Sequence, residues 1–396
     1  FYVRTLDPVG VFWFDPRADH LTPIPVPQGM KPLTLHTAAD GTLWLHNHTA
    51  IASLSQGQWE VFPYTESPEQ FVREIVTDRS GLIWFNPPGR LVSFDGKSFQ
   101  EEIFADTPEL SRIEHLGSTD ARWMFVDQSN VLWFTLGPNL CQRNENGFRI
   151  AHQLSSEVVS HEIRGLTQTS DGSIWLASYG GGMARVGEET LDWIDSSGGL
   201  PDDHVSQIVD DGSGTLWINT NAGLLSCSLE EAHAAVDGDL SNLRFRVYGT
   251  AECNSGIPAR TGSGLIAMPT TNGLLVIDPS RPPPPSPLPS PQLTPVSSRD
   301  QTFDLAADAD RPIAPGLGDR DLVFRFTAPW LHESENAAFE YRMIGLHEEW
   351  RSSRSDRHIR YADLRPGRYL FEVRTVGLDG TPNPQTATVA VLIPAK

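Results

Sequence analysis

The sequence predicts an all-β protein in two successive parts, and three observations lead to this prediction. A pattern that ends in an apolar residue and a tryptophan recurs about every forty residues. Each repeat has room for four short apolar runs separated by turn residues. A proline-rich stretch then separates the repeats from a tail of alternating polarity. Four strands per repeat are typical of a β-propeller, and we predict a seven-bladed β-propeller followed by an immunoglobulin-like β-sandwich.

The composition is that of a globular chain without long helices. Of 396 residues, 39% are hydrophobic and 20% are charged, so a core can form and disorder throughout is excluded. The 33 glycines and 31 prolines leave no room for a coiled coil. A net charge of −20 repels phosphate backbones and anionic lipid, so nucleic acid and membrane surfaces are poor partner candidates. No apolar run reaches membrane-spanning length.

The tryptophan repeat is the strongest pattern in the chain. Its tryptophans are 40, 49, 42 and 42 residues apart, at Trp44, Trp84, Trp133, Trp175 and Trp217. Three residues before each stands a glycine or, once, Asn130, and both residue types tolerate the positive φ of a tight hairpin. Three copies place an aspartate three residues further back, where its carboxylate can bond backbone N–H groups: Asp78, Asp127 and Asp211. We expect the tryptophan rings to pack between blades.

Two degenerate copies bring the count to seven. Ala267 replaces the tryptophan in one copy, and Tyr2 takes its place at the start of the chain. The first copy then lacks its innermost strand and the last lacks a clear outer strand, which leaves open whether residues before Phe1 complete the ring. In the clearest copy the strands are expected at His204–Val209, Leu216–Thr220, Gly223–Ser228 and Leu243–Tyr248. Insertions at Thr107–Leu116 and Leu229–Asp239 are expected to be short helices or loops.

Residues 279–292 are rich in proline, and this composition predicts a stiff polyproline-II linker. This places the propeller at 1–278 and the β-sandwich at 293–396. Strands with period-2 alternation are expected in the tail at Leu322–Phe326, Ala338–Met343, His358–Tyr361, Arg368–Val376 and Ala387–Ile393. Tyr361 and Tyr369 flank a turn, and we expect at least one to bury its ring and bond its hydroxyl to the backbone.

These repeats resemble the two-component-regulator propeller repeat. Its aspartate, glycine and tryptophan, and the Gly-Leu that follows, match Asp211–Trp217 and Gly223-Leu224. The tail resembles the triple-tyrosine (Y_Y_Y) domain, with Tyr341, Tyr361 and Tyr369 as its tyrosines. The order of propeller, proline linker and triple-tyrosine domain is more specific than either part. Most copies lack the Gly-Thr that follows the tryptophan in the family pattern.

The resemblance implies the extracytoplasmic sensor of a bacterial transmembrane signalling protein. In this family a membrane helix follows the triple-tyrosine domain, and the output module is a histidine kinase, a diguanylate cyclase or a DNA-binding domain. The implied location is periplasmic, and the implied oligomer is a homodimer that signals through one helix per chain. No cofactor is expected.

No catalytic motif stands out in the sequence. There is no Gly-x-Ser-x-Gly, His-Glu-x-x-His or P-loop pattern, and the three cysteines lack metal spacing. His46 and His48 form a His-x-His pair, which is better interpreted as an exposed polar loop than as a metal site. Two alternatives to a sensor stay open: a propeller enzyme of the lactonase or streptogramin-lyase type, and a protein-binding scaffold.

The ligand is predicted to bind where loops between second and third strands, and loops between blades, converge on the central channel. Their side chains are guanidinium, imidazole, amide and aromatic groups, which suit a carbohydrate or a similar small polar ligand. The candidates are His46, His48, Arg73, Arg90, Arg122, Trp123, His161, Arg164, Tyr179, His204 and Asn221.

Overall fold

The computed structural model places side chains for most of the chain. It describes residues 1–6, 9–47, 49–64, 74–87, 89–107, 110, 121–137, 139–153, 162–240, 243–248, 256–271, 273–282, 288–305, 311–328, 338–353, 357–377 and 381–395.

Two compact units make up the chain, and each is described by itself. Unit one comprises Phe1–Asn221, Cys227–Leu243 and Ala251–Pro282, and unit two comprises Ala222–Ser226, Arg244–Thr250 and Pro283–Lys396. The strands within Ala222–Ser226 and Arg244–Thr250 nevertheless pair by hydrogen bonds with the sixth sheet of the first unit.

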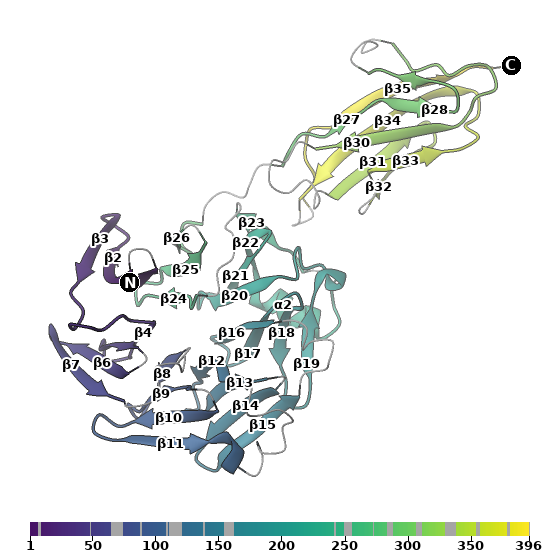
Figure 1. Cartoon of the computed structure of the whole chain (residues 1–396). Helices are drawn as coiled ribbons and strands as arrows, with labels where there is room; N and C mark the ends of the chain where they lie inside the picture. Colours follow the sequence, from purple (N-terminus) through teal and green to yellow (C-terminus); the bar gives the residue numbers. More distant parts are fainter. Residues whose placement is uncertain are drawn as a thin grey trace. The chain divides into compact units, whose positions relative to one another are not determined.

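Seven antiparallel sheets succeed one another in unit one, as the predicted seven-bladed propeller requires (Figure 1). The first three are β1 (Tyr2–Leu6), β2 (Val9–Asp15) and β3 (His20–Ile24); β4 (Thr34–Thr37), β5 (Leu43–His46), β6 (Ala50–Ser55) and β7 (Gln58–Pro63); and β8 (Ile75–Thr77), β9 (Ile83–Phe85), β10 (Arg90–Phe94) and β11 (Phe99–Ile103).

The remaining four sheets continue in the same order. They are β12 (Ala121–Val126), β13 (Leu132–Leu136), β14 (Asn139–Asn144) and β15 (Gly147–Gln153); β16 (Glu162–Gln168), β17 (Ile174–Tyr179), β18 (Gly182–Val186) and β19 (Leu191–Ile194); β20 (Val205–Asp210), β21 (Thr215–Thr220), β22 (Gly223–Ser228) and β23 (Arg246–Tyr248); and β24 (Ala259–Arg260), β25 (Ile266–Thr270) and β26 (Gly273–Ile277). In the described part of the chain, the first and last sheets have three strands each. The inner strands β4, β8, β12, β16 and β20 are successive neighbours, and they surround the propeller centre.

Three of the repeats are held by a carboxylate that binds both the turn and the tryptophan. Oδ1 of Asp127 accepts the N–H groups of Ser129 (2.8 Å) and Val131 (2.9 Å), and Oδ2 accepts the indole N–H of Trp133 (2.8 Å). Asn130 adopts φ 63° in this turn, as the sequence predicts. The same three bonds recur from Ser80, Leu82 and Trp84 to Asp78, and from Ser213, Thr215 and Trp217 to Asp211.

The same turns also connect neighbouring blades. The Arg79 N–H donates to Oδ1 of Asn130 in the next blade (2.8 Å), and the Gln128 N–H donates to Oε1 of Gln168 in the blade after that (2.7 Å). The Ser170 N–H donates to the Asp210 carboxylate in the same way. Consecutive blades are therefore fixed by backbone-to-side-chain bonds as well as by apolar packing.

Short helices lie outside the sheets. They are η1 (Phe104–Asp106), η3 (Ser196–Gly198) and α2 (Leu229–Val236). The insertion predicted at Leu229–Asp239 is thus mostly helical, whereas the one at Thr107–Leu116 lies almost entirely outside the described residues. α2 buries Ala232 and Ala235, and its His233 bonds Oδ2 of Asp171 (2.7 Å).

Two sheets form unit two, and all five predicted strands of the tail are present. One sheet contains β27 (Gln292–Leu293), β28 (Val296–Ser298), β29 (Thr302–Phe303), β30 (Leu322–Thr327) and β33 (His358–Tyr361); the other contains β31 (Ala338–Ile344), β32 (His347–Ser352), β34 (Gly367–Val376) and β35 (Ala387–Ile393). Phe324 and Phe371 stack between them with ring centroids 4.2 Å apart. The end of the predicted proline linker is bound to this unit, because the carbonyl of Pro289 accepts from Thr375 Oγ1 (2.7 Å) and Asn383 Nδ2 (3.0 Å).

Tyr369 forms the expected corner. Its hydroxyl donates to the carbonyl of Arg365 (2.9 Å), four residues upstream, although its ring is half-buried rather than fully buried. Tyr361 bonds His347 Nε2 instead (2.7 Å), and its ring packs on Phe371.

Trp350 packs against two arginine side chains of the second sheet. Its ring lies between the guanidinium groups of Arg342 (4.6 Å) and Arg374 (4.1 Å). Arg342 also pairs with Glu372 (2.6 Å), and Arg374 with Glu340 (2.7 Å), each across the strand pair of β31 and β34.

Asp127→Ala is expected to destabilise unit one by about 2–3 kcal/mol, because it leaves a buried indole N–H and two turn N–H groups without their acceptor. Asp127→Asn should cost less, since its amide oxygen still accepts from the turn. Asp95→Ala is the matched control: Asp95 bonds the turn N–H groups of Lys97 and Ser98 but no tryptophan. The measurement is the denaturant midpoint, and equal midpoints for Asp127→Ala and the wild type would contradict the role of this carboxylate.

Tyr369→Phe is expected to cost about 1 kcal/mol, which is the contribution of one hydrogen bond, and Tyr369→Ala about 3 kcal/mol. Thermal unfolding of the purified chain measures both. If both variants have the same thermal unfolding midpoint as the wild type, the Tyr369 hydrogen bond does not stabilise the sandwich.

Candidate functional site

Three successive inner strands have an irregularity at nearly the same place. In β12 the pairing with β13 skips Trp123, in β16 the pairing with β17 skips Arg164, and in β20 the pairing with β21 skips Ser206. Such an extra residue re-aims a side chain, and bulges of this kind occur often beside functional sites. Trp123 adopts φ 45°, a left-handed conformation that is unusual for a bulky residue.

Glu74 takes the corresponding place in the preceding blade. It lies one residue before Ile75, which is the first paired residue of β8. Its own N–H donates to the side-chain oxygen of Asn86 (3.0 Å) instead of to a strand carbonyl. β8 itself pairs in regular register, so three consecutive inner strands carry an irregularity and Glu74 stands just before a fourth.

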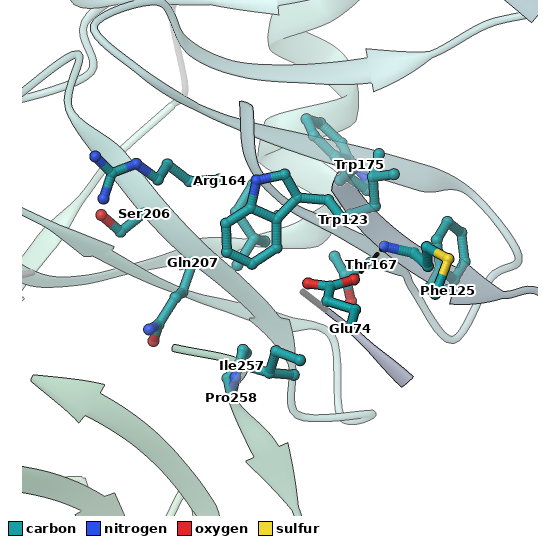
Figure 2. Close-up of a pocket in the computed structure, with 14 residues that line it drawn as sticks. Glu74, Trp123, Phe125, Arg164, Thr167, Trp175, Ser206, Gln207, Ile257 and Pro258 are labelled. Atoms are coloured by element: carbon teal, nitrogen blue, oxygen red, sulfur yellow. Dashed lines mark hydrogen bonds between the residues drawn. The ribbon is translucent and has the colours of Figure 1, made fainter. Parts of the chain in front are cut away.

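These four residues line one cavity at the propeller centre, with a volume of about 100 Å³ (Figure 2). Gln207 and Trp175 line it as well. Gln207 Nε2 donates to the carbonyl of Gly256 (2.7 Å), and this bond holds the amide toward the last blade. A second, more open cavity shares Phe125, Leu166 and Thr167 with the first and lies beside the Asp78 and Asp127 turns. The two cavities are successive parts of the central channel.

The Glu74 carboxyl is buried, with only 5% of the residue exposed. Burial raises its pKa to about 7, and the Met124 N–H that donates to Oε2 offsets only part of that effect. Glu74 can therefore exchange a proton near neutral pH, which suits a ligand-binding or acid–base role.

Two buried polar groups of the lining have no hydrogen-bond partner among the described residues. They are the Ser206 hydroxyl and the indole N–H of Trp175. The sequence explains the second: Thr169 stands where other repeats have the aspartate that accepts from the tryptophan, and its hydroxyl bonds Asp171 and Ser173 instead. A buried polar group without a partner is costly and calls for an explanation such as a ligand or bound water.

A polar cluster lies beside the cavity on β16, β17 and the loops around β20 and β21. The Arg164 guanidinium lies 4.3 Å from the Tyr179 ring centroid and pairs with Glu162 (2.8 Å). Asn221 Nδ2 donates to the Tyr179 hydroxyl (2.9 Å), and the His204 ring is 4.7 Å from that of Tyr179.

The structure therefore brings five of the predicted site residues together. Trp123 and Arg164 line the cavity, and Tyr179, His204 and Asn221 form the cluster with Arg164. His46 is not in an exposed loop: it ends β5, is 1% exposed and packs near Phe85. Arg90 pairs with Glu101 on the neighbouring strand (3.0 Å). The side chain of Arg122, and all of His48, Arg73 and His161, lie outside the described residues.

Glu74, Ser206 and Gln207 are the site residues that the sequence analysis missed. The repeat carried the signal, because Glu74 and Trp123 each lie ten residues before the tryptophan of their blade, and Arg164 and Ser206 lie eleven before theirs. No group of three or more histidine, cysteine or acidic side chains gathers as a metal site among the described residues. Of the helices that the structure describes, none is long and apolar enough to cross a membrane.

Glu74→Gln is expected to stabilise the protein, and more so as the pH rises. A carboxyl whose pKa is raised from 4.5 to about 7 on folding contributes stability that is present below pH 4.5 and is lost as the pH rises through 7. Glutamine keeps an acceptor for the Met124 N–H and removes that loss. We expect a gain of up to about 3 kcal/mol at pH 8 and much less at pH 5.

Denaturant midpoints of the wild type and Glu74→Gln at both pH values measure this gain. Glu102→Gln is the control, since Glu102 is a half-buried partner of Arg143 (2.7 Å) away from the cavity. A gain that is the same at pH 5 and pH 8 would contradict the assignment.

Comparison with known proteins supports the architecture. The Y_Y_Y domain family matches residues 332–393. No curated protein is similar enough in sequence to match the chain. The extracellular domain of a protein from B. thetaiotaomicron described as a hybrid two component system has a similar structure, with a TM-score of 0.62 and 17% identity. That comparison covers 98% of this chain and 53% of the other, so the chain spans about half the length of that extracellular domain.

Two lyases share the propeller part of the fold. Virginiamycin B lyase from Staphylococcus aureus gives a TM-score of 0.50 at 16% identity, covering 67% of this chain and 86% of the lyase. A streptogramin B lyase gives 0.51 at 14% identity, covering 67% and 85%. At these identities the likeness concerns the fold. Residues 332–393 therefore match the Y_Y_Y domain family, and the fold of the chain is similar to that of this extracellular domain.

Proposed function

We propose that this chain is the non-catalytic, ligand-sensing periplasmic region of a bacterial transmembrane signalling protein of the histidine kinase or diguanylate cyclase type. The order of propeller and Y_Y_Y domain supports this, as does the similar fold of an extracellular sensor domain over 98% of the chain. The parent protein would anchor this region by a membrane helix and signal as a homodimer. Crosslinking of the full-length protein in cells tests the dimer.

The proposed ligand site is the central cavity with its polar cluster. The observation that carries this proposal is the convergence of three strand irregularities, at Trp123, Arg164 and Ser206, on one cavity that Glu74 also lines. A ring with a purely structural role would need only regular strands, so these irregularities favour a binding role for the cavity. A small polar ligand such as a carbohydrate fits these groups, because a sugar ring can stack on Trp123 and hydroxyls can bond the unpartnered Ser206 and Trp175 groups.

A propeller enzyme is the second candidate. Glu74 favours it, since a buried carboxyl whose pKa is near 7 has the property required of a general acid or base. The likeness to the two lyases concerns the fold and adds no catalytic residue.

Calorimetry against a panel of plant and bacterial saccharides tests the sensor, with chromatography of each mixture to detect turnover. We expect at least one saccharide to bind without being converted to a product. The substitutions Trp123→Ala and Ser206→Ala, made together, should weaken the binding of that saccharide at least tenfold. Trp13→Ala is the control, because Trp13 is 45% exposed on β2. Product formation that Glu74→Gln abolishes would support the enzyme instead, and affinity that survives both cavity substitutions would exclude this cavity.

A further inference from the structure

The Glu74 carboxyl is a buried acid without a cationic partner among the described residues. Oε2 accepts the Met124 N–H, and Oε1 has no hydrogen-bond partner in the part of the chain that the structure describes. A buried carboxylate is costly unless a positive charge or several donors compensate it. Among the described residues, the cavity thus holds one acceptor without a compensating charge.

Arg164 does not supply the missing charge. Its guanidinium pairs with Glu162 (2.8 Å) and lies over the Tyr179 ring (4.3 Å). In Figure 2 the guanidinium end points away from Glu74, with the Trp123 indole between them. Arg164 and Glu74 are the only ionisable side chains of the described lining, and the Arg164 charge is already paired with Glu162.

Aromatic rings surround the same space. Trp123, Phe125 and Trp175 line the cavity, and the faces of aromatic rings attract cations. Trp123 holds a strained left-handed backbone conformation, and strain of this kind is retained at ligand clamps. The protein's net charge of −20 further favours cations over anions.

We propose that the central cavity binds a small organic cation, a protonated primary amine on a compact ring, with Glu74 as its counter-charge and Trp123 as its aromatic face. This inference rests on the proposed sensor function, because it narrows the ligand class of the same site. An amino sugar meets both requirements, since its ring can stack on Trp123 and its ammonium group can pair with the Glu74 carboxylate. A bare divalent ion fits poorly, because Glu74 is the one carboxylate of the described lining and such ions need several oxygen ligands.

Matched probes separate charge from shape. Glucosamine is compared with glucose, and tyramine with 4-ethylphenol, each by calorimetry and thermal shift on the whole chain at pH 7.5. We expect at least one amine to bind tenfold or more tightly than its neutral counterpart. Glu74→Gln should remove that preference, and Trp123→Ala should weaken amine binding about tenfold. Glu102→Gln, outside the cavity, should change neither.

Several outcomes would overturn the amine proposal. One is equal binding of the neutral and charged members of both pairs, and another is an amine preference that survives Glu74→Gln. Stabilisation by Mg²⁺ or Ca²⁺ alone that Glu74→Gln abolishes would replace it with a metal site. If no amine binds while a neutral saccharide binds and depends on Trp123 and Ser206, the amine proposal fails and the sensor function stands. If no amine and no saccharide binds, both fail.

Discussion

A carboxylate that recurs in three of the repeats determines much of this propeller. An aspartate that accepts two turn N–H groups and the indole N–H of a buried tryptophan ties hairpin geometry to core packing, as Asp127 does for Trp133. Because the turn also bonds the next blade, the register of one sheet constrains its neighbour. The orientation of the inner strands, and therefore the position of the side chains around the channel, depends on this interaction.

The cavity lies where this regularity is relaxed. Blade five has Thr169 in place of the aspartate, so its tryptophan keeps an indole N–H without a partner among the described residues, and that group lines the cavity. Skipped residues in three inner strands and the buried Glu74 add further cost. Several unfavourable features of the fold therefore lie around one space, as they commonly do at binding sites.

Local chemistry was enough to predict most of the architecture. Asp-x-x-Gly turns, tryptophans at a constant interval and period-2 strands depend on residues close in sequence, so blade number, tail strands and the Tyr369 corner could be predicted. Trp123 and Arg164 were expected in loops between blades, and this placement was wrong, because both lie within the inner strands β12 and β16. The placement of His46 was wrong as well, because its place at the end of a buried strand rather than in a loop depends on how far pairing extends.

The sequence by itself determined the seven-fold repeat and the all-β class, because each follows from short-range hydrogen bonding and side-chain alternation. The tertiary structure decided that a single carboxyl, Glu74, is buried beside aromatic rings without a described counter-charge. Burial, the resulting rise in its pKa and the unpartnered Ser206 hydroxyl depend on residues from separate blades meeting at the centre. Such long-range proximity leaves no mark on local sequence, since it arises only when the ring closes around its channel.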